Sequence, residues 1–259
     1  MSSISLMGSN LNIIIMAGGL GSRMKSELPK VLHRVNDIPM VVRVIEQAKK
    51  LQPKNILLVV GKYRKIIKET LEEFKMEEDE DFTFIMQEPA QGTGHAIQCC
   101  KQFLFVNGKD DDKVLILSGD TPLIQYDLMN SMLDFKDVKI MTTTRKDPHG
   151  YGRVKITDGV FDKIVEDKDC TKEELLIPQV NCGMYAFRNN LLCKYLGYLN
   201  NDNAQKEYYL TDMIEILKKH NCNISLHNLS VDDQWQLQGV NTKKQLEELN
   251  KRFEQIMNH

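Results

Sequence analysis

The sequence predicts an α/β protein: a mixed, mainly parallel sheet flanked by helices, with a smaller second lobe. Through the first half of the chain, short apolar runs rich in β-branched residues alternate with segments of helical period. In the second half, strand-like segments follow one another with loops between them. The 259 residues fill one such core and leave no room for a second large domain. We therefore expect a single domain over 1–259, with lobes at 11–137 and 138–240 and a closing helix over 241–259.

The first half predicts four strands, at 11–16, 55–60, 82–86 and 113–117. Helical periods lie between and after them, at 40–51, 63–75, 95–103 and 122–135. Crossovers of this kind join parallel strands in a sheet that is buried on both faces. Ligands then bind at the carboxyl ends of the strands.

In the second half, "VKIMTTTR", "RVKIT", "FDKIVED" and "QVNCGMYAF" predict further strands, followed by one helix pair. The tail over 242–257 predicts a helix, since Leu246, Leu249, Phe253 and Ile256 recur at helical spacing.

Composition narrows the classes of function. The formal net charge of −2 gives no reason to expect a nucleic-acid partner, and no apolar run is long enough to span a membrane. The opening "MSSISLMGSN" lacks the features of a signal peptide, so we expect a cytoplasmic protein. The cysteines show no CxxC pair and no metal-ligand spacing, and we interpret them as reduced, packed thiols.

A glycine-rich, basic loop follows the first predicted strand, in "IIIMAGGLGSRMKSELPK". Backbone N–H groups exposed by glycines can bind a phosphate, and basic side chains add full positive charge. The residues concerned are Gly18, Gly19, Gly21, Arg23, Lys25 and Lys30. Both the dinucleotide pattern GxGxxG and the Walker pattern GxxxxGK[ST] require a glycine where Met24 stands. A dinucleotide-dependent oxidoreductase is therefore disfavoured.

The same loop resembles the G-x-G-[ST]-R-M-x(n)-P-K signature of sugar-phosphate nucleotidyltransferases. The blocks "ELPKVLH", "QGTGHA", "SGDTPL", "DPHGYGR", "IVEDKD", "NCGMYAF", "NAQKEYYLTDM" and "GVNTKKQL" extend the resemblance to the uridyltransferase domain of bacterial N-acetylglucosamine-1-phosphate uridyltransferases. The resemblance implies the Rossmann-like nucleotide-diphospho-sugar transferase fold, with a nucleotide-binding lobe at 11–137 and a sugar-binding lobe at 138–240. It also implies transfer of UMP from UTP to N-acetyl-α-D-glucosamine 1-phosphate, with Mg²⁺ as cofactor and pyrophosphate as the second product.

The resemblance further implies a set of site residues. The catalytic cations are Arg23 and Lys30, and the metal ligands are Asp120 and Asn241. The nucleotide-binding residues are Met16, Ala17, Gly18, Gly19, Lys30, Gln87, Gly92 and Thr93. The sugar-binding residues are Gly152, Glu166, Asn181 and Asn241.

The residues alone leave structural alternatives open. Asp120 could cap a helix that begins at Thr121, and Asn241 stands where an N-cap residue of the final helix belongs. Gln87 offers the donor and acceptor that a uracil edge requires, while His95 is interpreted as a packed residue without a role. Glu166 could be a surface carboxylate at a strand edge, Asn181 a satisfied polar group of a strand, and Gly152 a turn glycine.

Three positions depart from the similar family members. These often carry glutamine, tyrosine and an acidic residue where Ala90, Ser118 and Gln238 stand, which bears on base and sugar preference. Bacterial members usually continue into an acetyltransferase β-helix, so we expect no acetyltransferase activity here, and the oligomeric state, a homo-oligomer included, stays open. Two alternatives remain: transfer to another sugar 1-phosphate, such as glucose 1-phosphate with UTP or dTTP, and a non-catalytic nucleotide-sugar sensor.

Overall fold

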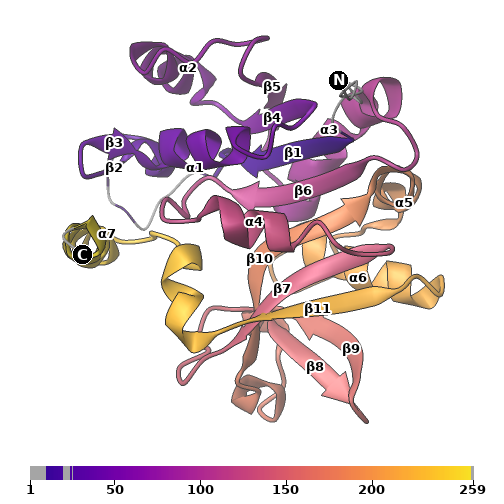
Figure 1. Ribbon diagram of the computed structural model, residues 1–259. Coiled ribbons are helices and arrows are strands. Elements are labelled where there is room, and N and C mark those ends of the chain that lie inside the picture. Colours follow the sequence, from indigo (N-terminus) through magenta and orange to yellow (C-terminus); the bar gives the residue numbers. More distant parts are fainter. Residues whose placement is uncertain (1–9, 20–23, 25, 258–259) are drawn as a thin grey trace, which may run out of the picture.

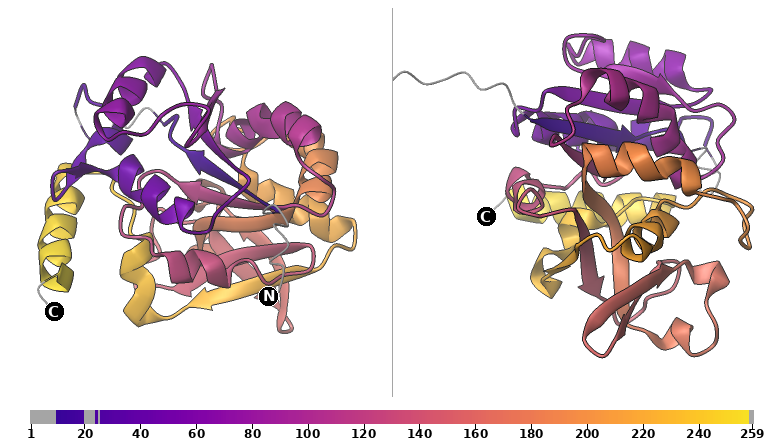
Figure 2. Two further views of the ribbon diagram at one scale, coloured as in Figure 1. Left: turned by 45° about the horizontal axis from the view of Figure 1, so that its top comes forward. Right: turned by 90° about the vertical axis from the view of Figure 1, so that its right-hand side faces the viewer.

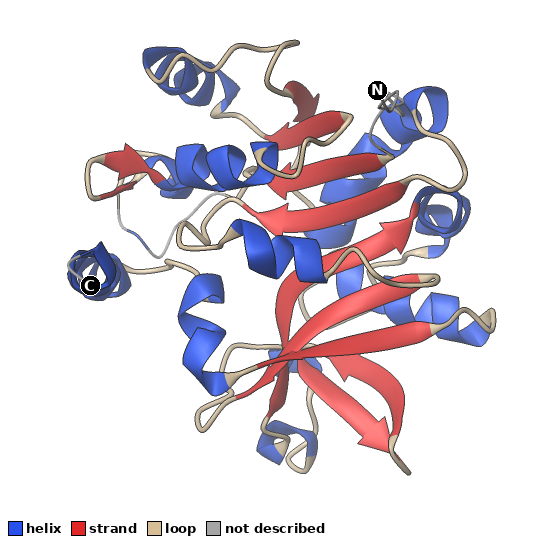
Figure 3. Cartoon of the chain, in the orientation of Figure 1, coloured by secondary structure: helices blue, strands red, loops and turns tan. Residues whose placement is uncertain are grey.

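The computed structural model describes residues 10–19, 24 and 26–257. Nine strands form one sheet, whose main path runs β11-β7-β10-β6-β1-β4-β5, and β8 and β9 branch from β10 (Figures 1 and 3). The strands of this sheet are β1 (Leu11–Met16), β4 (Asn55–Val60), β5 (Thr83–Met86), β6 (Lys113–Ser118), β7 (Val138–Thr144), β8 (Arg153–Thr157), β9 (Val160–Val165), β10 (Gln179–Arg188) and β11 (Ile224–Leu229). A separate ribbon pairs β2 (Arg34–Val35) with β3 (Ile38–Pro39).

The sheet is parallel where the crossovers predict it. β1 pairs in parallel with β4 and β6, and β4 pairs in parallel with β5. β10 runs antiparallel to both β6 and β7, and β11 runs parallel to β7. The carboxyl ends of β1, β4, β5 and β6 therefore share one edge of the sheet, while the β8–β9 hairpin projects below it in Figure 1.

Helices cover both faces of the sheet, as the views of Figure 2 show. They are α1 (Met40–Lys49), α2 (Arg64–Glu73), α3 (Thr93–Asn107), α4 (Tyr126–Ser131), α5 (Asn189–Tyr195), α6 (Leu210–Lys219) and α7 (Lys243–Met257). Ile13 and Ile15 of β1 pack with α1, α2 and α4, whereas Ile14 packs with α3, α5 and α6. Because successive side chains of a strand point to opposite faces, the unbroken apolar run of β1 is what a doubly covered strand requires.

The C-terminal helix α7 lies beside the β2–β3 ribbon (Figure 1), where Asn250 Oδ1 accepts a hydrogen bond of 2.8 Å from the Asn36 amide. Leu249 of α7 is fully buried in a third apolar cluster that also contains Met24, Met40 and Val240. This cluster anchors the segment that leads into α7 against the first half of the chain.

The four parallel strands predicted from the first half are confirmed to within one residue, and the strands predicted in the second half are present. The helix predicted over 122–135 is wrong in extent, since α4 covers only Tyr126–Ser131. The residues before it form turns, held by a 2.9 Å hydrogen bond from Thr121 Oγ1 to the Ser118 carbonyl. The six cysteines, all among the described residues, form no disulfide, as expected.

Candidate active site

A cavity of about 480 Å³ opens at the carboxyl edge of the parallel strands. Its walls come from the segments that follow β1, β5 and β6, the start of α3, and two segments of the second half. The lining residues are Met16, Gly18, Gly19, Lys30, Val31, Gln87, Ala90, Gly92, Thr93, Ala96, Ser118, Asp120, Glu207 and Asn241. The structure thus brings together most of the predicted nucleotide-binding and metal-binding side chains.

Two predicted residues of the first loop differ from the rest. Ala17 does not line this cavity, and its backbone N–H donates to the Val59 carbonyl of β4 at 2.8 Å. Arg23 lies outside the described residues, as do Gly21, Ser22 and Lys25.

The Lys30 ammonium joins the two predicted metal ligands. Its Nζ donates to Asp120 Oδ2 and, at 3.2 Å, to Asn241 Oδ1. Ser118 Oγ donates to the other carboxylate oxygen of Asp120 at 2.6 Å. Lys30 stands 90 residues before Asp120 and 211 before Asn241, so the fold assembles this cluster from three distant segments.

Backbone contacts place Asp120 and Asn241 side by side. Asp120 follows β6 directly, and its carbonyl accepts a 3.2 Å hydrogen bond from the Val240 amide, the residue before Asn241. A Cβ on Gly239 would lie only 3.6 Å from Asp120 Oδ2, so this chain segment passes close to the carboxylate. The two side chains reach the cluster from adjoining backbone.

Both capping alternatives are wrong. Asp120 lies six residues before α4 begins, and its side-chain oxygens accept from Lys30 and Ser118 instead. At α7, Thr242 Oγ1 accepts from the Gln245 amide at 3.2 Å while Gln245 Oε1 accepts from the Thr242 amide at 3.1 Å. This reciprocal pair is a capping box, with Thr242 rather than Asn241 at the N-cap.

The cluster fits a divalent cation. One carboxylate oxygen and one amide oxygen converge on a single positively charged nitrogen, the Lys30 ammonium, which stands in for a cation between them. Oxygen ligands from few side chains suit Mg²⁺, which keeps several waters and takes substrate phosphates as further ligands. Within the described ranges no group of three or more His, Cys, Asp or Glu side chains could hold a metal. A cation held by the two oxygens of this cluster would need waters or substrate phosphates as its further ligands.

Gln87 lies beside Gly18 and is buried, with 5% of its surface exposed. Its Nε2 donates to the Gly92 carbonyl at 2.9 Å, and its Oε1 faces Gly18, where an added Cβ would come within 2.9 Å. Gly92 has φ of +106°, and a Cβ there would lie 2.5 Å from the Tyr208 carbonyl. Gly18 is therefore required beside the Gln87 side chain, and Gly92 is required for its positive φ and for the close approach of the Tyr208 backbone.

Three of the four predicted sugar-binding residues, Gly152, Glu166 and Asn181, form a second group outside the lining of the cavity, whereas Asn241 lines it. The backbone N–H of Asn181 donates to the Gly152 carbonyl at 2.9 Å, and a Cβ on Gly152 would lie 3.6 Å from Glu166 Oε1. Asn181 Nδ2 donates to the Tyr185 hydroxyl at 2.5 Å. Burial raises the pKa of Glu166, against which a hydrogen bond from Thr211 acts.

The segment 207–211 connects the two groups. The Leu210 amide donates to Thr93 Oγ1 at 3.1 Å, and the Tyr208 carbonyl accepts from the Gly94 amide at 2.7 Å. Thr211 Oγ1 donates to Glu166 Oε1 at 2.9 Å, and Glu207 lines the cavity. The sequence predicts no role for Glu207 or Thr211, although both lie in the block "NAQKEYYLTDM" that carries the resemblance.

A half-buried carboxylate beside this segment gives a testable stability effect. Burial, and after it the nearby carboxylates of Glu215, Glu166 and Asp169, raise the pKa of Asp212 from 3.8 to about 6. Because this acid titrates at higher pH in the folded chain, folding favours its protonated form, and the free energy of unfolding falls as pH rises from 3.8 to about 6. Above about pH 6 the ionised Asp212 lowers the free energy of unfolding by its full amount.

Asp212→Asn is therefore expected to raise the free energy of unfolding by about 1 to 3 kcal/mol at neutral pH and to change it little near pH 4. Urea unfolding at both pH values measures the difference. Asp202→Asn, at a side chain that is 94% exposed, is the matched control and should change neither value appreciably. If Asp212→Asn raised the free energy of unfolding equally at both pH values, or lowered it at neutral pH, the raised pKa of Asp212 would be contradicted.

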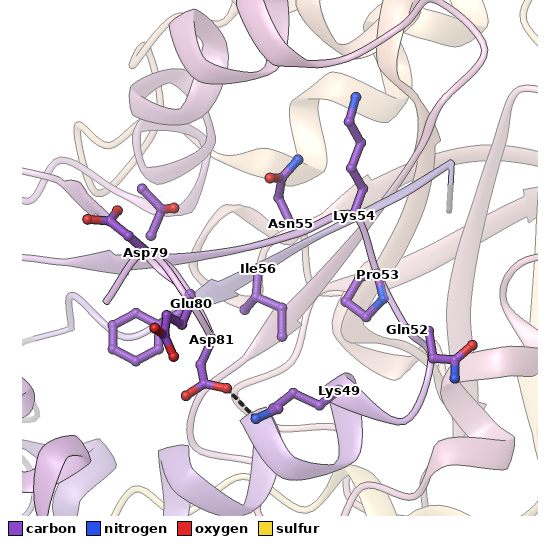
Figure 4. Close-up of a pocket in the computed structure, with 11 residues that line it drawn as sticks. Lys49, Gln52, Pro53, Lys54, Asn55, Ile56, Asp79, Glu80 and Asp81 are labelled. Carbon is purple, nitrogen blue, oxygen red and sulfur yellow. Dashed lines mark hydrogen bonds and ion pairs between the residues drawn. The ribbon is translucent and has the colours of Figure 1, made fainter. Parts of the chain in front are cut away.

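A second hollow, of about 230 Å³, lies at the opposite edge of the sheet, where β4 and β5 begin (Figure 4). Asp81 pairs there with Lys49 of α1, and a second oxygen of Asp81 accepts from the Glu77 amide at 2.9 Å. Since these charges satisfy one another, we assign no site to this hollow.

No helix among residues 10–19, 24 and 26–257 combines the length and the apolar character needed to cross a membrane.

Comparison with known proteins gives one family match. Residues 13–166, more than half of the chain, match the family of MobA-like NTP transferase domains. The matched range includes Lys30, Gln87 and Asp120 of the cavity and ends at Glu166.

Two curated relatives show the extent of the similarity. The chain is 39% identical over 253 residues to bifunctional protein GlmU of Clostridium botulinum (strain 657 / Type Ba4), covering 95% of this chain and 52% of that protein. It is 37% identical over 244 residues to an Acanthamoeba polyphaga mimivirus protein assigned as a UDP-N-acetylglucosamine pyrophosphorylase, covering 92% of this chain and 94% of that one. The chain thus spans about half the length of the GlmU protein and nearly all of the viral one.

Among solved structures, a Bacillus anthracis protein assigned as a glucose-1-phosphate thymidylyltransferase, crystallised with sucrose, superposes with a TM-score of 0.69. The superposition covers 93% of this chain and 94% of that chain at 21% identity. At this identity the likeness shows the fold alone.

Proposed function

This chain belongs to the family of MobA-like NTP transferase domains, and on that premise we propose that it transfers UMP from UTP to N-acetyl-α-D-glucosamine 1-phosphate. A phosphate oxygen of the sugar phosphate attacks the α-phosphorus of UTP in line. A new P–O bond forms to the α-phosphorus while its bond to the leaving pyrophosphate breaks. No protein group becomes covalently attached, so the residues act by positioning and by stabilising charge.

The observation that carries this proposal is the cluster of Lys30, Asp120 and Asn241 in a cavity that Gln87 also lines. A cation, an acid and an amide oxygen at the carboxyl edge of parallel strands are suited to a nucleoside triphosphate with its metal. The name of the viral relative, to which the chain is similar over nearly the whole length of both, supports N-acetylglucosamine as the sugar.

Asp120 and Asn241 would hold Mg²⁺, which in such sites neutralises charge on the reacting phosphates. Lys30 would then leave these oxygens and neutralise the triphosphate and the departing pyrophosphate. Arg23, for which the structure gives no position, is proposed as the second catalytic cation. Gly18 and Gly19 line the same cavity as this cluster, and their backbone is proposed to contact the phosphates.

We assign recognition of the two substrates to the two connected groups of residues. Gln87, with Gly92 and Thr93, would read the uracil, and Gly152, Glu166 and Asn181 would hold the sugar through its hydroxyls and acetamido group. Segment 207–211, which bonds to both groups, sets their spacing. The smaller side chains at Ala90 and Ser118 line the nucleotide cavity, so any change of base preference should originate there.

One substrate panel tests the proposal. UTP, dTTP and GTP are paired with the 1-phosphates of N-acetylglucosamine, glucose and mannose in the presence of Mg²⁺, and pyrophosphate release is measured. We expect the pair of UTP and N-acetylglucosamine 1-phosphate to give the highest kcat/KM by about 10-fold or more. A faster reaction with another pair would reassign the substrate. Binding of UTP without pyrophosphate release from any pair would favour the nucleotide-sugar sensor.

A further inference from the structure

His95 contacts the residue that is proposed to read the base. It lies in the first turn of α3, partly buried and behind Gln87, and does not line the cavity. Its Nδ1 lies 3.4 Å from Gln87 Nε2, and its Nε2 lies 3.8 Å from the sulfur of Cys99, one helical turn further on. A chain of contacts therefore runs from Cys99 through the imidazole to the amide of Gln87.

The partners of Gln87 fix which end of its amide faces the cavity. Nε2 donates to the Gly92 carbonyl at 2.9 Å, and Nδ1 of His95 is the second acceptor that this NH₂ group meets. Turning the amide over would place Oε1 against the Gly92 carbonyl and the His95 lone pair, so acceptors would face acceptors. The observed orientation directs Oε1 toward Gly18, which is in the wall of the cavity.

An imidazole nitrogen accepts a hydrogen bond only when it carries no proton. With Nδ1 as acceptor, the proton of neutral His95 resides on Nε2, where the Cys99 sulfur stands as a weak acceptor. Cys99 and His95 are four residues apart on one face of α3, so the helix itself supplies this arrangement. The contact with Cys99 is compatible with this tautomer, and the NH₂ group of Gln87 is the partner that requires it.

We propose that His95 is a positioning residue that sets the base preference of the cavity by holding the Gln87 amide with its oxygen toward the bound nucleotide. This inference rests on the proposed function and deepens it. A cavity that presents an acceptor favours a pyrimidine with a donor at N3, as in uracil, and disfavours cytosine, whose N3 is an acceptor. From the sequence, His95 is interpreted as a packed residue without a role; this inference gives it the role of positioning Gln87.

The test compares UTP with CTP in binding to the full chain, by titration calorimetry with Mg²⁺ present. His95→Phe keeps a ring of similar shape and removes both nitrogens, whereas His95→Asn keeps an acceptor near the position of Nδ1. We expect His95→Phe to shift the ratio of CTP to UTP dissociation constants toward CTP by about 5-fold, the effect of losing one hydrogen bond, and His95→Asn to restore most of the preference. Should His95→Phe fail to fold, His95→Leu replaces it.

The outcomes separate the inference from the proposed function. Equal weakening of UTP and CTP binding in both variants would make His95 a purely structural residue and overturn the inference, as would a wild-type chain without preference for UTP. Binding that follows the expected ratios in a chain that releases no pyrophosphate would support the inference and contradict the proposed transfer reaction.

Discussion

Replacing Asp120 with asparagine is expected to lower kcat by about 10²-fold or more and to weaken Mn²⁺ binding by a similar factor while the fold is retained. The substitution keeps the size of the side chain and removes the only full negative charge of the Lys30, Asp120 and Asn241 cluster. Asparagine Oδ1 can still accept from Lys30 while its Nδ2 donates to Ser118 Oγ, so the local packing should persist. Turnover by pyrophosphate release and Mn²⁺ binding by electron paramagnetic resonance measure the two effects.

Asp127→Asn is the matched control for Asp120→Asn. Asp127 is an exposed residue in the first turn of α4, and it follows the same strand, β6. The control should leave both kcat and Mn²⁺ binding near the wild-type values. If Asp120→Asn kept more than a tenth of wild-type turnover with unchanged Mn²⁺ binding, Asp120 would not be a metal ligand.

The second large effect is expected at Lys30, where turnover and metal binding should change in opposite directions. Lys30→Met removes the cation proposed to neutralise the triphosphate, which should lower kcat by about 10²-fold. In the absence of nucleotide, however, the same ammonium occupies the oxygens of Asp120 and Asn241. Its removal should therefore tighten Mn²⁺ binding to the free protein, because the metal no longer has to displace it.

Lys65→Met controls for the loss of one positive charge, since Lys65 lies on α2 with a side chain that is 90% exposed. It should affect neither turnover nor Mn²⁺ binding. A Lys30→Met protein whose Mn²⁺ affinity falls, or stays at the wild-type value, would show that the ammonium does not occupy the metal position.

The sequence predicted the parallel half of the sheet well, because strands buried on both faces read as unbroken apolar runs. β1 and β4 have the predicted limits. The edge strand β11, "ISLHNL", was not predicted: it mixes polar with apolar residues, and its pairing with β7 depends on the rest of the sheet. The two-residue strands β2 and β3 carry too little periodicity to show in a pattern.

Only part of the candidate site could be predicted from local sequence patterns. Local pattern placed a phosphate loop after β1 and a carboxylate after β6, since both follow buried strands whose carboxyl ends share an edge. It could not bring Asn241 to Asp120, because that contact depends on α7 packing into the cluster of Met24, Met40 and Val240. The residues alone predict Asn241 as the N-cap of the final helix, a position that Thr242 occupies in the structure. Family resemblance supplied the metal-binding interpretation.

The role proposed for His95 could not be predicted from the sequence at all. Nothing in its sequence position indicates an acceptor for Gln87, since the contact depends on the side-chain orientations of two residues on different elements. The resemblance covers the block "QGTGHA" but supplies no reason for the histidine. Only the geometry of the Gln87 amide gives it one.

Asp120 and Asn241 are proposed to hold together the metal that accompanies the nucleotide. Anomalous diffraction from crystals grown with Mn²⁺ and a non-hydrolysable UTP analogue tests it most directly. We expect one anomalous peak within bonding distance of an Asp120 carboxylate oxygen and Asn241 Oδ1, with Lys30 Nζ moved onto the phosphates. A peak bound to other side chains, or Lys30 still lying between the two oxygens with nucleotide in place, would contradict it.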